Sequence, residues 1–355
     1  MQGEAAVPFL DNPGALRQVA RVPATDSSSI APAAHDPQGP KGDGDRDRDA
    51  RPRSVAFAPP VATQAIGVFD SGVGGLTVAR AVLARLPGER LVYLGDTARV
   101  PYGMRSAQTV LRYSRNAARF LLHNTVKLVL IACNTASAAA LDELRAELPV
   151  GVLGAVEPGA AAAAAATRSA VVGVIGTLAT VRSGAYERAL LAQNPALKVH
   201  TAACPLLVPL IEEGWTADQD PVSELVVRRY LTELRQRAPE LDTLVLGCTH
   251  YPLLAPLLQR VAGELWGHPI ALVDSAQAMA EAAAAELARR QLLAADPLPE
   301  LPTPGEPPRR RATDRLRCFV TDEARVAEVG ARFLGRDLGP IELVDLVDTG
   351  AHGTS

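Results

Sequence analysis

The sequence predicts an α/β protein of two similar doubly wound lobes, with mainly parallel sheets and an active site in the cleft between them. Short apolar runs rich in β-branched residues alternate with helical segments from residue 65 onward, an order typical of parallel sheets. Each half opens with a strand, a small-residue loop and a helix, and each later contains a strand that ends in cysteine followed by two polar residues. Because ligand clefts favour domain interfaces, we expect the site between the lobes.

The first lobe is predicted to comprise residues 64–160 together with a C-terminal part at about 270–346. It follows an N-terminal extension, residues 1–63, which we expect to be disordered because residues 36–53 are dominated by Gly, Pro and charged side chains. The strands are predicted at 66–69, 91–94, 127–132, 150–153, 270–273 and 316–320, and the helices at 76–86, 106–123, 137–148, 276–293 and 323–333. An Ala-rich helix opens at residues 157–159, where a proline is well tolerated in the first turn.

The second lobe is predicted to comprise residues 161–269. Its strands are expected at 171–175, 198–202 and 243–246, and its helices near 183–193, 220–237 and 252–265. Residues 294–314 are rich in proline and arginine, so we expect a surface insertion there.

Composition narrows the class of protein. The 355 residues carry 36 Lys and Arg against 39 Asp and Glu, without a basic stripe interleaved with aromatics, so nucleic acid is not an expected partner. Four widely spaced cysteines do not form a disulfide scaffold and fit a reducing cytoplasm. No apolar stretch approaches the ~18 residues of a membrane span, and the first residues lack the basic and apolar regions of a secretory signal. We therefore expect a cytoplasmic protein without a membrane partner.

The loop at residues 72–75 is glycine-rich and allows two interpretations. It follows a strand, and Asp96 stands at about the distance of the ribose-binding acid of a dinucleotide site. Against a nucleotide, Thr77 replaces the last small residue of that motif, and Asp70 would lie beside a pyrophosphate. We favour a tight turn that aims backbone N–H groups and Ser71 at an anion, with Asp70 at the strand end.

Two cysteines are candidates for chemistry. Cys133-Asn134-Thr135 and Cys248-Thr249-His250 each follow an apolar strand. A lone cysteine is often only a buried apolar residue, but polar groups at the start of the following helix suit a carboxylate ligand. Inversion of a carbon centre needs one base on each face, and two strand-end thiols supply such a pair. Cys204 and Cys318 lack polar neighbours of this kind and are predicted to lie in the core.

The sequence offers little to hold a cofactor. Cys248 and His250 form only a Cys-x-His pair without further ligands, so no metal site is predicted. The lysines are Lys41, Lys127 and Lys198, and none is placed to form the Schiff base of a pyridoxal phosphate enzyme. A thiol-redox protein would have its cysteines close together, as in Cys-x-x-Cys, which is absent. We expect no cofactor.

Four segments resemble the signature blocks of glutamate racemases, in the aspartate/glutamate racemase superfamily. The blocks are Phe69-Asp-Ser-Gly-Val-Gly-Gly-Leu76, Gly95-Asp-Thr-Ala-Arg-Val-Pro-Tyr-Gly103, Cys133-Asn-Thr-Ala136 and Gly247-Cys-Thr-His-Tyr-Pro252, with Val174-Ile-Gly-Thr177 and Val208-Pro-Leu-Ile-Glu212 as further similar stretches. The match runs roughly from residue 66 to 346. The extension and the segment at 294–314 depart from the family pattern.

The resemblance implies cofactor-independent interconversion of L- and D-glutamate, which feeds peptidoglycan synthesis, cell wall biogenesis and cell shape. It implies that Cys133 and Cys248 are the acid/base thiols, assisted by Asp70 and His250 respectively. The substrate-binding residues that it implies are Asp70, Ser71, Tyr102, Gly103, Asn134, Thr135, Thr249 and His250. Thr177 and Glu212 are further substrate-binding residues that the resemblance implies less strongly. It leaves the oligomeric state open, and a homodimer is compatible with it.

An aspartate racemase of the same superfamily is the nearest alternative. His250 favours glutamate, because aspartate racemases usually carry an acidic residue at that place. The chemistry needs help from neighbours in either case: a free thiol titrates near ~8.5 and is only a few per cent ionised at pH 7. A nearby acid or base must therefore set its protonation.

Overall fold

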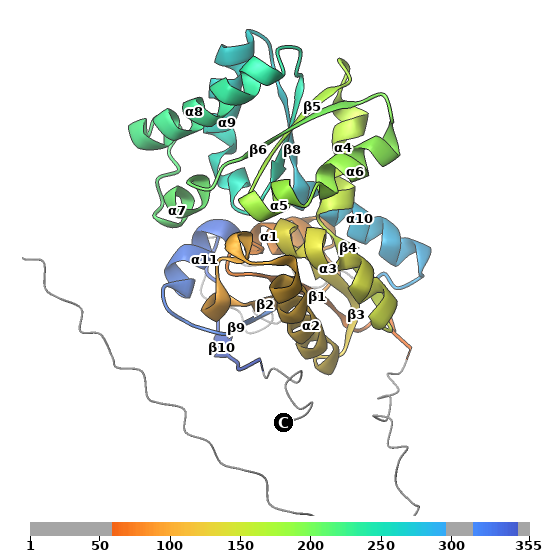
Figure 1. Ribbon diagram of the computed structural model, residues 1–355. Coiled ribbons are helices and arrows are strands. Elements are labelled where there is room, and N and C mark those ends of the chain that lie inside the picture. Colours follow the sequence, from red (N-terminus) through yellow and green to blue (C-terminus); the bar gives the residue numbers. More distant parts are fainter. Residues whose placement is uncertain (1–58, 296–314, 347–355) are drawn as a thin grey trace, which may run out of the picture. The chain divides into compact units, whose positions relative to one another are not determined.

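The computed structural model describes residues 59–295 and 315–346, which belong to one compact unit, Ala56–Ser355. The predicted extension up to residue 58, and residues 296–314 of the predicted insertion, lie outside the described residues. Two sheets, each with its own helices, form the two lobes (Figure 1). All strand pairings within the described ranges are parallel. The α/β class with parallel sheets is confirmed.

The first sheet has the strand order β10-β9-β2-β1-β3-β4. Its strands are β1 (Ala65–Asp70), β2 (Leu91–Gly95), β3 (Val126–Ile131), β4 (Gly151–Gly154), β9 (Leu316–Val320) and β10 (Ile341–Leu343). The register of the central strand β1 places Asp70 opposite Gly95 of β2 and Phe69 opposite Ile131 of β3. The carboxyl ends of these strands therefore meet at one edge, where the chain delivers Asp70 and Cys133.

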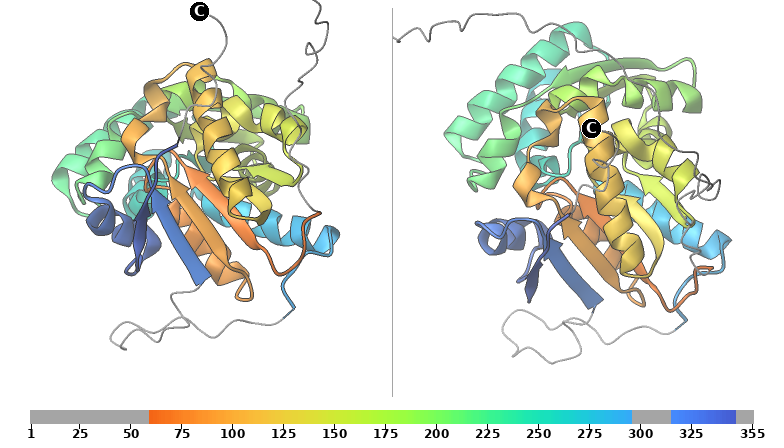
Figure 2. Two further views of the ribbon diagram at one scale, coloured as in Figure 1. Left: turned by 90° about the horizontal axis from the view of Figure 1, so that it is seen from below. Right: turned by 60° about the horizontal axis from the view of Figure 1, so that its bottom comes forward.

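Helices cover both faces of this sheet (Figure 2). They are α1 (Leu76–Arg85), α2 (Ala107–His123), α3 (Asn134–Glu147), α10 (Ser275–Arg289) and α11 (Val326–Leu334), with short 3-10 turns η1 (Thr97–Arg99) and η2 (Tyr102–Met104). Side chains alternate along β3: Leu128 and Leu130 join the core that contains α1, α10 and α11, while Val129 and Ile131 join the core of α2 and α3. The two-sided burial explains why these strands are continuously apolar.

The second sheet has the order β6-β5-β7-β8. Its strands are β5 (Val171–Gly176), β6 (Lys198–Ala203), β7 (Thr243–Gly247) and β8 (Ala271–Asp274). The helices of this part are α4 (Val156–Ala166), α5 (Leu178–Arg182), α6 (Ala185–Gln193), α7 (Leu207–Glu212), α8 (Pro221–Arg237) and α9 (Ala255–Trp266), with η3 (Tyr251–Leu254). Gly176 pairs with Gly247, so Thr177 and Cys248 leave neighbouring strand ends, as Asp70 and Cys133 do in the first lobe.

The structure differs from the predicted elements in several places. β8, assigned from sequence to the C-terminal return into the first lobe, pairs with β7 in the second sheet, so the chain returns only after Asp274. A short parallel strand carries no signal for which of two sheets it joins. The helix expected from residue 137 begins at Asn134, because Cys133 caps it by accepting the N–H of Ala136. The edge strand β10 and the short helix α7 were not predicted.

The N-terminal boundary of the first lobe lies slightly before the predicted one. The buried ammonium of Lys127 donates to the carbonyl of Ala62 at 2.6 Å and pairs with the buried carboxylate of Glu89 at 2.6 Å. The same ammonium donates to the carbonyl of Leu292 at 2.8 Å. Lys127 therefore holds two segments in place, the one before β1 at Ala62 and the one after α10 at Leu292.

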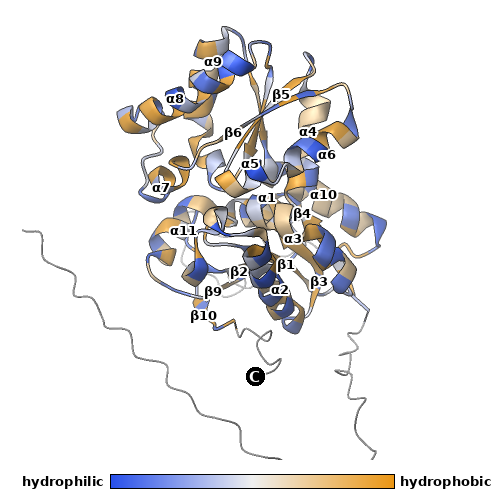
Figure 3. Ribbon diagram, viewed as in Figure 1, coloured by the Kyte–Doolittle hydropathy of each residue, from blue (hydrophilic) through white to orange (hydrophobic). Residues whose placement is uncertain are grey.

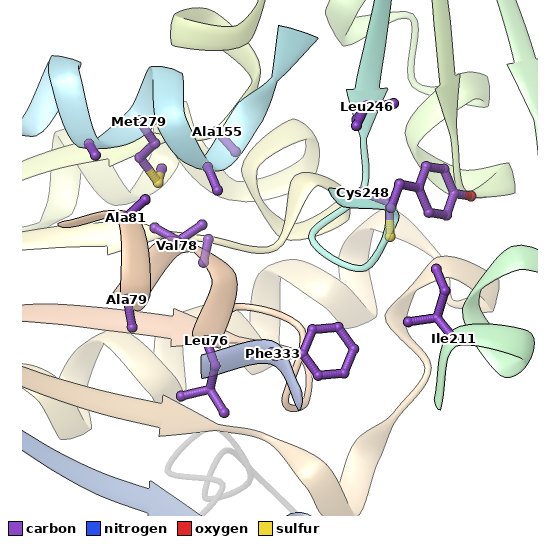
Figure 4. Close-up of a cluster of buried hydrophobic side chains, with 14 of the residues drawn as sticks. Leu76, Val78, Ala79, Ala81, Ala155, Ile211, Leu246, Cys248, Met279 and Phe333 are labelled. Carbon is purple, nitrogen blue, oxygen red and sulfur yellow. The ribbon is translucent and has the colours of Figure 1, made fainter. Parts of the chain in front are cut away.

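A large apolar core joins residues of both lobes. It includes Leu76 of α1, Ile211 of α7, Cys248 and Phe333 of α11, which Figure 4 shows together. Hydrophobic residues are concentrated in the strands, whereas helices such as α2 expose polar side chains (Figure 3). Across residues 59–295 and 315–346, no helix has both the length and the hydropathy to cross a membrane.

Candidate active site

A cavity of about 380 Å³ opens between the strand ends of the two lobes. Its lining contains all but one of the residues singled out from the sequence. These are Ser71, Tyr102, Gly103, Cys133, Asn134, Thr135, Thr177, Glu212, Cys248, Thr249 and His250. Apolar side chains such as Val208 and Leu178 complete the wall. The structure therefore gathers both thiols and their polar neighbours around one space of the size of a small ligand.

The first thiol, Cys133, lies among neutral partners. Its sulfur donates toward Ser71 Oγ at 3.6 Å and accepts the backbone N–H of Ala136 at 3.4 Å. Burial, reinforced by the nearby charge of Asp70, raises the pKa of the Cys133 thiol to about 12. Cys133 therefore rests as a protonated thiol, which is the form that donates a proton.

Asp70 is the predicted residue that does not line the cavity. It is buried directly behind the glycine-rich loop, where its Oδ2 accepts the N–H of Gly72 at 3.1 Å and its Oδ1 has no hydrogen-bond partner. Burial raises the pKa of this carboxyl, and the charge of His250 and the loop N–H groups partly offset that rise. A buried carboxyl oxygen without a partner lowers the stability of the fold, so a role in the site would explain why it is present.

The second thiol, Cys248, lies beside an imidazole. Its sulfur is 3.8 Å from His250 Nδ1, and His250 Nε2 is 2.9 Å from Glu212 Oε1. Burial alone would lower the pKa of His250, but the hydrogen bonds to Cys248 and Glu212 outweigh it and raise the pKa to about 10. A protonated imidazole beside a sulfur stabilises negative charge on it. The residues Cys248, His250 and Glu212 therefore place a thiol, an imidazole and a carboxylate in one chain of contacts at the cavity.

Hydroxyl groups connect the two lobes across the cavity. Thr135 Oγ1, on α3, lies 2.9 Å from Thr177 Oγ1 and 3.1 Å from Thr180 Oγ1, on the second lobe. The side chain of Asn134 is already engaged, because Tyr186 donates to its Oδ1 at 2.7 Å and its Nδ2 donates to Ser275 at 3.4 Å. At this end of α3 the N–H of Ala136 is already bonded to Cys133 Sγ, so helix geometry leaves the backbone N–H groups of Asn134 and Thr135 for a carboxylate.

Tyr102 and Gly103 form the neighbouring wall. The Tyr102 hydroxyl donates to Asp96, whose other oxygen accepts from Thr321 Oγ1 at 3.0 Å. Asp96 is fully buried in this arrangement, so it is not placed as a ribose-binding acid. A Cβ at Gly103 would lie 2.9 Å from Thr177 Cβ, which explains why glycine stands where the two lobes approach.

Several residues of the site carried no signal in the sequence. Tyr186, Thr180 and Ser275 act on Asn134 and Thr135 from elements 45 to 141 residues away. Thr77 was noted only as a departure from a nucleotide motif, yet its hydroxyl donates to the carbonyl of Thr249 at 3.0 Å. Only their contacts in the folded chain identify them.

A cavity of about 490 Å³ between α3, α4 and α6 is larger but contains neither strand-end thiol. Among the described residues, no group of three or more His, Cys, Asp or Glu side chains is arranged to hold a metal ion. Cys204 and Cys318 are buried and do not line the 380 Å³ cavity. The chemistry of the site must therefore be argued from Cys133 and Cys248.

Known proteins match this arrangement. The chain matches the family model for Asp/Glu/Hydantoin racemase over residues 76–283. It is 49% identical over 284 residues to the glutamate racemase of Geobacter metallireducens, covering 80% of this chain and 97% of that protein. A crystal structure of a glutamate racemase isoform from Bacillus anthracis aligns with a TM-score of 0.71 at 35% identity, covering 80% of this chain and 98% of that one. The Francisella tularensis glutamate racemase in complex with D-glutamate aligns with a TM-score of 0.69 at 32% identity, covering 81% and 99%.

The parallel two-lobed fold and the paired thiols thus define an amino-acid racemase, and the chain belongs to the Asp/Glu racemase family. Within that family it belongs with the glutamate racemases, isomerases that interconvert L- and D-glutamate. The resemblance carried by the four sequence blocks is confirmed.

Proposed function

We propose that the protein interconverts L- and D-glutamate by a two-thiol acid/base mechanism that needs no cofactor. The single observation that carries the proposal is that Cys133 and Cys248 line one cavity from two different lobes. Each thiol then faces its own side of a substrate α-carbon.

In one direction Cys248 acts as the base. Its thiolate, stabilised by the imidazolium of His250, takes the α-proton, so the C–H bond breaks and an S–H bond forms. The S–H bond of Cys133 then breaks, and its proton adds to the opposite face of the α-carbon. The reverse direction starts from the Cys133 thiolate and the protonated Cys248.

The intermediate carries negative charge on the α-carboxylate in an enolate-like form. The backbone N–H groups of Asn134 and Thr135, at the start of α3, and the hydroxyl of Thr135 would stabilise this charge. Asp70, behind the glycine-rich loop, assists Cys133. Glu212 assists Cys248 through its hydrogen bond with His250 Nε2. Removing a proton α to a carboxylate is difficult without an electron sink, so this stabilisation must supply much of the rate.

We further propose that the product D-glutamate supplies peptidoglycan synthesis, and through it cell wall biogenesis and cell shape. A cytoplasmic location and a homodimeric assembly are part of the same proposal. The family membership supports this role, because free D-glutamate is the product that such an enzyme makes.

Circular dichroism tests the reaction directly. Purified protein, incubated with L-glutamate and no added cofactor, should reduce the optical signal to zero, and D-glutamate should approach the same end point. Activity with aspartate but not with glutamate would overturn the substrate assignment. Activity lost on EDTA treatment and restored by a metal ion would overturn the cofactor-free mechanism.

A further inference from the structure

The helix α11 belongs to the first lobe, yet it contacts the two residues of the second lobe that support Cys248, which are Glu212 and His250. Arg332 Nη1 donates to the backbone carbonyl of Glu212 at 2.9 Å, while Nη2 pairs with Glu328 on the same helix at 2.6 Å. The next residue, Phe333, is fully buried and packs edge-on against His250, with ring centroids 4.9 Å apart and an interplanar angle of 75°. Two consecutive residues of α11 therefore contact both supports of Cys248.

The chain makes room for the Arg332 guanidinium. Gly214, two residues after Glu212, has a left-handed φ of +82°, and a Cβ there would lie 2.9 Å from Arg332 Nη1. Glycine satisfies both the backbone conformation and the close approach of the side chain. A second, more exposed ion pair joins Arg325, at the start of α11, to Glu213 at 2.8 Å.

Glu212 needs external support to hold its position. It is the last residue of α7, a helix of six residues, and such short helices are not stable alone. Its side chain is 42% exposed, so burial does not fix the carboxylate. His250, in contrast, is buried and meets Phe333 on one side. The hydrogen bond of 2.9 Å between His250 Nε2 and Glu212 Oε1 therefore depends on where the Glu212 backbone is held.

We propose that Arg332 and Phe333 are positioning residues for the second acid/base group: Arg332 fixes the backbone of Glu212, and Phe333 fixes the ring of His250. This inference rests on the proposed two-thiol function. It adds that the first lobe contributes to the reactivity of Cys248, so only one of the two half-reactions depends on α11.

The experiment measures proton removal from each enantiomer separately. Elimination of a leaving group from the L and D forms of a β-substituted glutamate analogue needs a proton removed but none returned, so each form reports one thiol. Arg332→Gln should lower elimination about tenfold (~1.4 kcal/mol on the barrier) for the enantiomer that Cys248→Ser no longer processes. Elimination from the other enantiomer should change less than about twofold, and Arg332→Lys should recover part of the loss.

Two further measurements separate positioning from folding. Phe333→Leu keeps an apolar side chain but removes the ring edge, and it should slow the same enantiomer. The alkaline limb of the pH–rate profile should move to lower pH in Arg332→Gln, because the hydrogen bond that His250 Nε2 donates to Glu212 helps to keep His250 protonated. Arg325→Gln is the matched control, since it removes the ion pairs of Arg325 with Glu213 and Glu328 but leaves the Arg332 contact with Glu212 in place, and it should leave both enantiomers unaffected.

The outcomes distinguish the inference from the function on which it rests. If Cys133→Ser and Cys248→Ser do not separate the two enantiomers, the two-thiol function fails. If they do separate them, but Arg332→Gln and Phe333→Leu slow both enantiomers equally or neither, the positioning role of α11 is wrong.

Discussion

The surroundings of Cys133 and Cys248 differ in charge, although the two thiols occupy matching places in two similar lobes. Cys133 lies near the Ser71 hydroxyl and the Ala136 N–H, with the buried carboxyl of Asp70 behind the glycine-rich loop. Cys248 has an imidazole that is itself hydrogen-bonded to Glu212. The repeated strand-Cys pattern determines where each thiol lies, but the side chains around the two thiols differ and were not part of that pattern.

This difference suits a reaction that is symmetrical overall. One turnover needs a thiolate on one face and a thiol on the other, and two identical surroundings would not favour that combination. Burial holds Cys133 protonated, with its pKa raised to about 12, while the protonated His250 stabilises charge on Cys248. In the proposed mechanism these two surroundings serve opposite roles, which exchange after each turnover.

Removing either thiol should have the largest effect. We expect Cys133→Ser and Cys248→Ser each to reduce racemisation at least ~10³-fold, since general acid–base groups contribute ~10²–10⁴ and a serine hydroxyl is a far weaker acid. Each variant should still eliminate from one enantiomer of the β-substituted analogue, and the two should prefer opposite enantiomers. From the family resemblance, we expect the Cys133 thiol to act on the D-form and the Cys248 thiol on the L-form. A single variant that racemises at the wild-type rate would refute the comparison.

Replacing the assisting groups should give a smaller, one-sided loss. His250→Asn should slow elimination from the enantiomer processed by Cys248 by about 10²-fold, and Asp70→Asn should slow the opposite enantiomer. The measurement is kcat for each enantiomer, with circular dichroism of the protein as the control for folding. Equal losses on both enantiomers in either variant would mean that Asp70 and His250 act on a shared step.

The sequence predicts the parts of the site that lie at strand ends. Cys133, Cys248 and the glycine-rich loop each follow an apolar strand, and parallel strands bring their carboxyl ends to one edge. The polar residues that follow each thiol, Asn134-Thr135 and Thr249-His250, were expected at the site and do line the cavity. Such local patterns need no knowledge of which strands are neighbours.

Contacts between distant segments could not be predicted in this way. β8 is short, and nothing in its four residues distinguishes a place beside β7 from a place in the first sheet. Arg332 resembles any other basic residue at the end of a helix, and only the folded chain shows that it reaches Glu212. Asn134 lines the cavity as the sequence led us to expect, but its hydrogen bond from Tyr186 carried no signal in the sequence. These features depend on packing between elements rather than on local pattern.

Two adjacent glycines allow the halves of the site to be disturbed one at a time. A Cβ at Gly74 would overlap His250 Nδ1 and Thr249 Oγ1, whereas a Cβ at Gly75 would lie 2.5 Å from Asp70 Cβ. We expect Gly74→Ala to slow the enantiomer processed by Cys248 about tenfold (~1.4 kcal/mol), and Gly75→Ala to slow the other enantiomer.

The control for these two variants is Gly263→Ala on α9, where no atom lies within 4 Å of the added Cβ. It should leave both rates unchanged and stabilise the protein slightly, by up to ~1 kcal/mol, because alanine favours a helix interior over glycine. If Gly74→Ala and Gly75→Ala impair the same enantiomer, the loop does not separate the two halves as we describe.

A change in the pH dependence of stability is also expected, where His250 and Cys133 act in the same direction but over different pH ranges. The folded pKa of His250 is raised from 6.5 to about 10, so its contribution to the free energy of unfolding is fully present below about pH 6.5 and is lost as the pH rises toward 10. The Cys133 thiol is raised from 9.0 to about 12, so its stabilising effect is lost only between about pH 9 and 12. Urea unfolding between pH 6.5 and 8.5 covers much of the range in which His250 acts, and a variant that changes only the surroundings of His250 assigns its share of the slope. We expect the wild type to lose stability over this range and Glu212→Gln to lose less, because this variant removes the carboxylate charge that helps to raise the pKa of His250. Cys133→Ser should follow the wild-type slope below pH 8.5 and diverge only above pH 9. A Glu212→Gln slope equal to that of the wild type would show that Glu212 does not support the protonated imidazole.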